Sequence, residues 1–286
     1  MQTISEHTKG LFFVLTAALL WSTGGLFIKL ISFSAMQLSF FRCAIAAITF
    51  ALIFKKRILL LNKLSIMNSI IYAVVLISFV IATKTTTAAN AIFLQATAPI
   101  YVLIFEPILT KSKYNRVNII TVGVCVVGMI LFFVGKLEPG HLEGNLVALI
   151  SGITFAAFFL GMKKNDQQYQ QSSIFWGNII VALICIPFLA SLEMITFSDI
   201  WMVSFLGVFQ IAIAYAFFAS GLKRNIAVEA SIISMIEPVL NPVWVFLGYG
   251  EIPTVFAIIG GTIILGAIIV RTIYSGSGVV IRKFRT

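Results

Sequence analysis

Long apolar runs separated by short polar joins recur along the whole chain. Each run holds about twenty residues, the length of helix that crosses the roughly 30 Å hydrocarbon core of a bilayer. The joins are short and mostly polar, as expected of helix-to-helix turns at a membrane surface. The pattern predicts ten membrane-spanning helices, over residues 10–31, 37–54, 66–83, 88–109, 117–135, 145–162, 173–192, 200–222, 227–247 and 254–273.

Composition places the chain in the same class. Hydrophobic residues make up 60% of it and charged residues 10%, and the mean hydropathy of +1.05 lies far outside the range of a soluble domain. The first apolar run is longer than the apolar core of a signal peptide and runs on into Lys29 without a cleavage site, so we expect it to be retained. Cys43, Cys125 and Cys185 lie inside apolar runs without paired spacing, which favours small packing residues over disulfides or metal ligands.

Lys and Arg residues fall mainly in alternate joins. If the N-terminus is cytoplasmic, sixteen of the twenty lie in cytoplasmic segments, and the positive-inside rule then predicts that both termini are cytoplasmic. The same asymmetry explains the net charge of +10, so no nucleic-acid partner is expected. The sixteen are Lys9, Lys55, Lys56, Arg57, Lys63, Lys111, Lys113, Arg116, Lys163, Lys164, Lys223, Arg224, Arg271, Arg282, Lys283 and Arg285.

The second half of the chain repeats features of the first in the same order. Because each half holds five helices, an odd number, the second half must enter the membrane upside down relative to the first. We therefore expect an all-α integral membrane protein with ten transmembrane helices as two inverted five-helix repeats, residues 1–143 and 144–274, followed by a basic cytoplasmic tail, residues 275–286. The matched pairs are Gly10 with Gly144, Lys29 with Lys163, Lys84 with Lys223, Ala91 with Ala230, Pro99 with Pro238, Gly123 with Gly261 and Gly128 with Gly266.

The ninth run carries an acid near its middle. Glu237 is followed directly by Pro238 and one turn later by Pro242. An ionised carboxylate at that depth costs several kcal/mol unless it is neutral, paired or hydrated. We expect Glu237 to bind the cationic group of a substrate or to carry a proton. The alternative is a protonated acid hydrogen-bonded to a neighbouring helix. The aligned position in the first half is Ala98, so the acid occurs in one half only.

Prolines and polar residues accompany this acid. Pro99, Pro238 and Pro242 kink their helices and free backbone carbonyls, which suits a hinge or the lining of a site as well as a purely structural role. A polar and aromatic pocket would suit a zwitterion or a flat apolar side chain. Taken singly, each of its members is more commonly a packing or interfacial residue. The predicted substrate-binding residues are Glu237, Gln95, Ser231, Ser234, Asn241, Tyr101, Trp21, Trp244, Gln210 and Tyr215.

Charged residues near helix ends have simpler explanations. Lys29 and Arg42 are expected at the outer ends of the first two helices, with their side chains reaching the headgroups; a gate or salt bridge is the alternative. Asn90 and Glu229 start the fourth and ninth helices, where we expect them to cap the helix and favour its dipole. The repeated glycines of the fifth and tenth helices are expected to let backbones approach each other.

Five stretches spread over the chain together carry a family resemblance: WSTGGLFIK (21–29), FFRCAIAA (40–47), AANAIFLQATAPIY (88–101), EASIISMIEPVLNPVWVFLGYGE (229–251) and GGTIILG (260–266). They resemble the EamA-type members of the drug/metabolite transporter superfamily, and the resemblance covers essentially the whole chain. It implies a ten-helix carrier with both termini inside, helices four and nine near the pseudo-two-fold axis, and one central cavity. Members of the family move amino acids, sugars, nucleotide derivatives and other small metabolites, often outward across a bacterial inner membrane.

Enzymatic chemistry finds little support in the residues. His7 and His141 have no partner at metal-ligand or triad spacing. A phosphate-binding loop needs Lys and then Ser or Thr after its second glycine, where Met129 and Ala267 stand. No cofactor or metal is expected, and the chain is not expected to be an enzyme.

The predicted function is a secondary transporter of small metabolites, most simply amino acids or related amphipathic compounds, working outward by alternating access across the bacterial inner membrane. An importer or exchanger of a nucleotide derivative or a sugar is the alternative within the same class. An intramembrane enzyme acting on lipid and a scaffold without transport are the alternatives from other classes. The expected partners are a small-molecule substrate and the lipid bilayer, with proton coupling through Glu237 left open.

Overall fold

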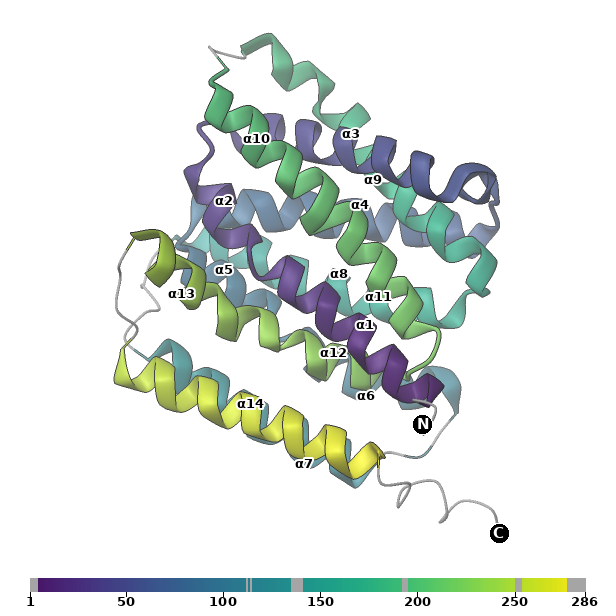
Figure 1. Ribbon diagram of the computed structural model, residues 1–286, viewed down its shortest axis with the longest axis vertical. Coiled ribbons are helices and arrows are strands. Elements are labelled where there is room, and N and C mark those ends of the chain that lie inside the picture. The colour runs from purple at the N-terminus through teal and green to yellow at the C-terminus, as the bar shows by residue number, and fades with distance from the viewer. Residues whose placement is uncertain are drawn as a thin grey trace.

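The computed structural model describes residues 5–111, 113, 115–134, 141–191, 195–249 and 254–276, and all regular structure in these ranges is helical. The helices lie side by side as one bundle (Figure 1). In chain order the elements are α1 (Glu6–Trp21), α2 (Gly24–Leu30), α3 (Ala35–Phe54), η1 (Lys55–Leu59), α4 (Lys63–Thr85), α5 (Ala88–Gln95), α6 (Ala98–Thr110), α7 (Arg116–Phe133), α8 (Leu142–Lys164), η2 (Gln167–Tyr169), α9 (Gln170–Cys185), η3 (Ile186–Ser191), α10 (Phe197–Phe205), η4 (Leu206–Ile213), α11 (Ala214–Leu222), α12 (Ala227–Ser234), α13 (Ile236–Tyr249) and α14 (Val255–Gly276).

These elements form ten spans that are long and apolar enough to cross a membrane within the described ranges. Each span corresponds to one predicted helix, which confirms the fold class of ten helices in two five-helix halves. The spans are numbered here in chain order. Spans three, five, six and ten are the single helices α4, α7, α8 and α14, whereas spans one, four and nine are each broken into two α-helices. Span eight contains a π-helical segment, η4.

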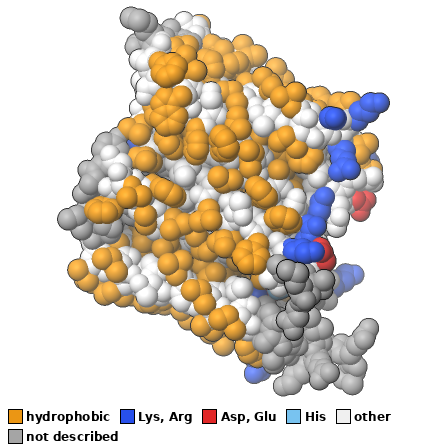
Figure 2. All heavy atoms as spheres, in the orientation of Figure 1, with side chains coloured by type: hydrophobic (Ala, Val, Ile, Leu, Met, Phe, Trp, Pro, Cys, Tyr) orange, Lys and Arg blue, Asp and Glu red, His pale blue; other side chains and the backbone are white. Residues whose placement is uncertain are grey.

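The two ends of the bundle differ in charge. Lys and Arg side chains gather along the edge where the N-terminus lies, and the face between the edges is largely hydrophobic (Figure 2). Large apolar side chains such as Leu52, Leu142 and Phe197 are exposed on the bundle, as expected of a surface that meets lipid. We call the two ends the basic end, with residues 5–9, 55–63, 163–170, 222–227 and 271–276, and the opposite end, with residues 30–35, 84–90, 141–145 and 195–199.

The last helices of the two halves, α7 and α14, lie together at one side of the bundle (Figure 1). A Cβ added to Gly260 would lie 2.4 Å from the carbonyl oxygen of Gly128, so the backbones meet where no side chain fits. The expectation that the repeated glycines pack is wrong for Gly123 and Gly266, where a Cβ would meet open space. All three cysteines are free and buried, as expected.

Candidate functional site

Three spans break near the middle of the bundle. In span one, α1 ends at Trp21; in span four, α5 ends at Gln95; in span nine, α12 ends at Ser234. Pro99 and Pro238 then lie in the first turn of the next half-helix, where a missing N–H group costs no helical hydrogen bond. The prolines that the repeat places at equivalent positions thus follow equivalent breaks.

A cavity lies at these breaks, and the space free of protein atoms there, open solvent included, is about 370 Å³. It shares Gln95, Phe155 and Glu237 with a second cavity of about 350 Å³. Together they form one polar and aromatic space between the halves, which we call the central cavity. The first part is lined by Ile92, Gln95, Ala96, Ala98, Pro99, Phe155, Phe159, Ser231, Ser234, Met235, Glu237 and Pro238. The second is lined by Trp21, Arg42, Val75, Leu76, Phe79, Gln95, Phe155, Gln210, Tyr215 and Glu237.

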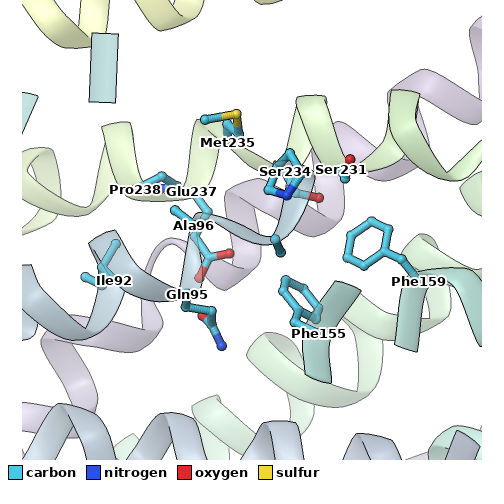
Figure 3. A pocket seen from close by; sticks show the side chains of 12 residues that line it. Ile92, Gln95, Ala96, Phe155, Phe159, Ser231, Ser234, Met235, Glu237 and Pro238 are labelled. Atoms are coloured by element: carbon cyan, nitrogen blue, oxygen red, sulfur yellow. The ribbon is translucent and has the colours of Figure 1, made fainter. Parts of the chain in front are cut away.

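Glu237 borders both parts of the central cavity. Its carboxylate extends from α13 toward Gln95 in α5, with Phe155 of α8 beside them (Figure 3). The ion pairs found among the described residues do not include Glu237. The carboxylate is therefore directed into the cavity rather than toward a cationic side chain.

Hydrogen bonds to α8 and within α12 orient the neighbouring amide and hydroxyl groups. Gln95 donates from Nε2 to Ser151 Oγ at 2.7 Å. Ser231 and Ser234 donate their hydroxyls back to the carbonyls of Val228 and Ala230, each at 2.9 Å. Because both hydroxyl hydrogens are used within α12, the serine oxygens present acceptor lone pairs to the cavity.

Aromatic rings close the other side of the cavity. The ring centroid of Trp21 lies 4.8 Å from that of Tyr215 and 5.7 Å from that of Phe155. Tyr215 in turn lies 4.7 Å from Tyr72, centroid to centroid. Trp21 is buried, and its Nε1 has no hydrogen-bond partner among the described residues. The pocket therefore offers flat apolar faces together with an unused N–H group.

Arg42 lies in the central cavity and not at the headgroups. It is the eighth residue of α3, so its Cα lies about 10 Å along the helix from the first residue. The residue is 1% exposed, and Nη2 donates to the carbonyl oxygen of Leu76 at 2.9 Å. The expectation that its side chain reaches the headgroups is wrong, because the side chain points between the helices.

Three other predicted residues contact the break in span one. Asn241 Nδ2 donates to the carbonyl oxygen of Ser22 at 3.1 Å, and Trp244 Nε1 donates to Ser22 Oγ at 2.8 Å. A Cβ on Gly24 would lie 2.7 Å from Nε2 of Gln210. The two glycines of the WSTGG stretch thus make room for polar side chains from spans eight and nine.

Of the three residues that contact the break in span one, Gln210 alone also lines the central cavity. The other predicted residues do not line it or are described in part only. Tyr101 is half-buried in α6 and does not belong to the cavity lining. Pro242 lies in α13, and its side chain falls outside the described residues.

Lysines hold equivalent contacts at the two ends of the bundle. At the opposite end, Lys29 Nζ donates to the carbonyl oxygen of Thr86 at 3.1 Å. At the basic end, Lys163 Nζ donates to the carbonyl oxygen of Leu222 at 3.0 Å. These lysines are a matched pair of the repeat, and each bonds a carbonyl at the C-terminal end of the third span of its half. A gate at Lys29 stays a prediction, and Lys163 is its counterpart.

A charged network joins several spans at the basic end. Glu229 accepts from Arg271 Nη2 at 2.5 Å and contacts His7 Nε2 at 2.9 Å, while Arg271 also donates to Asn118 Oδ1. Glu106 accepts from the backbone N–H groups of Ala227 and Val228 at 2.6 and 2.8 Å. The carboxylate at the start of α12 is therefore that of Glu106, and Glu229 links helices instead of serving only as a cap.

The structure adds cavity residues that the sequence interpretation did not place in the cavity. Arg42, predicted there as a headgroup residue or a gate, is the eighth residue of an apolar helix, too deep for a headgroup contact, and this depth is the available signal. Glu106 likewise lies inside an apolar run. Phe155 and Phe159 carry no such signal, because phenylalanine is common throughout the chain. Within the described ranges no group of three or more His, Cys, Asp or Glu residues could hold a metal ion.

Curated relatives of this chain are transporters by name. The chain is 25% identical over 287 residues, covering 91% of it and 92% of the relative, to an uncharacterized transporter of Clostridium kluyveri. It is 25% identical to the uncharacterized transporter YdfC of Bacillus subtilis over 66% of this chain and 63% of the relative. It is 24% identical to human solute carrier family 35 member G1 over 61% of this chain and 53% of the relative.

A solved crystal structure shares the fold. It superposes with a TM-score of 0.79 and 17% identity, over 94% of this chain and 98% of the solved one. The sequence profile of the EamA-like transporter family matches residues 8–134 and, again, residues 142–273. These two matches span nearly all of the ten helices described above. The chain therefore belongs to the EamA-like transporter family, as one of its multi-pass membrane transporters.

Proposed function

We propose that this protein carries small metabolites, most simply amino acids or related amphipathic compounds, outward across a bacterial inner membrane by alternating access. The observation that carries the proposal is the central cavity at the three helix breaks, with the Glu237 carboxylate directed into it. A carboxylate kept between membrane helices without a cationic partner is costly, which favours a functional role. Both halves line the space, so a rotation of one half against the other would open it to either side.

The contacts at the two ends suit such a cycle. The carbonyl contacts of Lys29 and Lys163 and the Glu229–Arg271 pair join helices without covalent links. In the proposed cycle one end opens while the other stays closed. The positive-inside rule supports a cytoplasmic location for the basic end, and with it for both termini.

Flux into proteoliposomes tests this function. The panel contains amino acids, amines, sugars and nucleotide derivatives, each measured at two pH values and in both directions. We expect saturable flux of amino acids by the unmodified protein and a loss of at least tenfold in Glu237→Gln. Lys164→Gln, at the basic end and away from the cavity, is the control and should retain flux.

The outcomes separate the parts of the proposal. Flux of no solute in the panel by folded protein contradicts the transport function itself. Flux with unchanged rate and unchanged pH dependence in Glu237→Gln removes that acid from the mechanism. Flux that responds to an imposed proton gradient only when Glu237 is present supports proton coupling through this residue.

A further inference from the structure

The two parts of the central cavity differ in their charged residues, because Glu237 lines both parts and Arg42 lines the second part only. The part next to α12 holds the Glu237 carboxylate and the acceptor oxygens of Ser231 and Ser234. The part next to α3 is lined by Arg42 and Trp21, whose buried Nε and Nε1 atoms have no hydrogen-bond partner among the described residues. Glu237 borders both parts. A cavity divided in this way offers one region to a cation and an adjoining region to an anion.

Arg42 has more donors than the protein satisfies. It is 1% exposed, its Nη2 bonds the carbonyl of Leu76, and its Nε has no hydrogen-bond partner among the described residues. None of the ion pairs found in these ranges includes Arg42. A guanidinium carries five N–H donors arranged to meet a carboxylate through two parallel bonds. Nearby, the buried Nε1 of Trp21 is a second donor without a partner.

The two charges face the same space without neutralising each other directly. Arg42 and Glu237 both line the second part of the cavity, yet no ion pair joins them. Keeping two opposite charges inside a membrane bundle is costly unless something completes their bonding. A ligand that carries one positive and one negative group would complete both.

We propose that Arg42 binds the carboxylate of a zwitterionic substrate whose ammonium group lies at Glu237. The substrate class is that of free α-amino acids and other small solutes with one amine and one carboxylate. The apolar side chain of such a solute would lie against Phe155 and Phe159. This inference rests on the proposed transport function and narrows it, because amines without a carboxylate and acids without an amine each leave one charge unmatched.

Ligand binding by the purified, full-length protein tests the assignment. The probes are two matched sets: L-phenylalanine, phenethylamine and 3-phenylpropionate for a large side chain, and L-alanine, ethylamine and propionate for a small one. Affinity is read from the ligand-induced rise in unfolding temperature, and transport from counterflow in proteoliposomes. In the unmodified protein we expect an amino acid to bind more tightly than its amine and its acid.

The variants separate the two charges. Arg42→Gln should weaken amino-acid binding by about 10- to 100-fold, the range for a lost hydrogen bond to a charged group, and leave amine binding within about threefold. Glu237→Gln should weaken binding of the amino acid and the amine but not of the acid. Arg57→Gln, which removes an exposed cation from η1, is the matched control and should change none of these affinities.

Several results would overturn the assignment. Equal losses for amino acid and amine in Arg42→Gln would make Arg42 a structural residue. A second outcome needs no variant: tighter binding of an amine than of its amino acid by the unmodified protein would also overturn the assignment. This comparison can be made even if Arg42→Gln does not fold. If other solutes are transported and Arg42→Gln does not change their flux, this inference alone is overturned. If the protein transports no solute at all, the proposed function is overturned.

Discussion

Spans four and nine begin at equivalent places in the two halves, at opposite ends of the bundle, and different chemistry holds the two starts. At the opposite end, Thr87 Oγ1 caps α5, while Asn90 and Thr86 bond to Asn145 Oδ1. At the basic end, the equivalent of Asn90 is Glu229, which pairs with Arg271. The two repeats make a contact at the same position, but the contact of Asn90 is neutral and the contact of Glu229 is charged. We infer that the basic end is the harder one to open.

The largest effect is expected where a carboxylate caps a buried helix start. Glu106→Ala leaves the N–H groups of Ala227 and Val228 without acceptors, and each buried orphan costs about 1–3 kcal/mol. We expect a loss of about 2–4 kcal/mol in unfolding free energy, measured by denaturation in detergent. Thr87→Ala removes the neutral cap at the other end and should cost about 1 kcal/mol. Equal losses in the two variants would remove the difference between the ends.

The next effect concerns the ion pair. Arg271→Gln removes the guanidinium from the buried Glu229, which keeps its contact with His7, and a lost hydrogen bond to a charged group costs about 1.5–3 kcal/mol. We expect the basic end to open more often, read as faster maleimide labelling of a Ser231→Cys reporter from that side. The double variant Glu229→Gln with Arg271→Gln should restore slow labelling, because no uncompensated charge remains. A double variant that labels as fast as Arg271→Gln would argue against electrostatic locking.

Smaller effects, one at each end of the bundle, are expected at the matched lysines Lys29 and Lys163. Lys163→Met removes the contact of a half-buried lysine at the basic end, and Lys29→Met removes the contact of a more exposed lysine at the opposite end. We expect about 1 kcal/mol for Lys163 and less for Lys29, because water screens the exposed amine. The reporter at position 231 should gain accessibility from the side of the removed lysine in each case. Gains from the same side in both variants would contradict the assignment of one gate to each.

The smallest effect is expected at His7. Its Nε2 contacts Glu229 at 2.9 Å, but the side chain is one-third exposed. His7→Ala should change the opening of the basic end by no more than about 1 kcal/mol, and added salt should reduce that change further. Labelling of the same reporter at low and high salt measures it. A larger, salt-independent change would place His7 among the principal contacts.

The sequence was sufficient for the architecture because span length and apolar composition depend on local residues alone. The ten spans, the repeat, and the equivalence of Lys29 with Lys163 all follow from such local patterns. The breaks at Pro99 and Pro238 were also predictable as kinks, since proline acts on its own helix. Their convergence on one cavity was expected only from the family resemblance.

The partners of buried charges were not predictable in the same way. Glu229 and Arg271 lie 42 residues apart, and Glu106 reaches Ala227 across 121 residues. No local pattern couples such positions, so the rule that an acid caps the helix it starts points to Glu229 and not to Glu106, whose carboxylate accepts from the start of α12. The expectation that Arg42 reaches the headgroups equates the start of its helix with the membrane boundary. Its eighth position in α3 places it well inside.

The close approach of α7 and α14 has a consequence for the history of the chain. Gly260 of one half meets the Gly128 carbonyl of the other, and each half contributes its own last helix to the seam. The same element of two copies packs in this way across the two-fold axis of a homodimer, although here the glycine contact is made once, because Gly266, the match of Gly128, meets open space. Fusing two subunits frees each copy to vary alone, and that freedom allows one half to carry Glu237 where the other keeps Ala98.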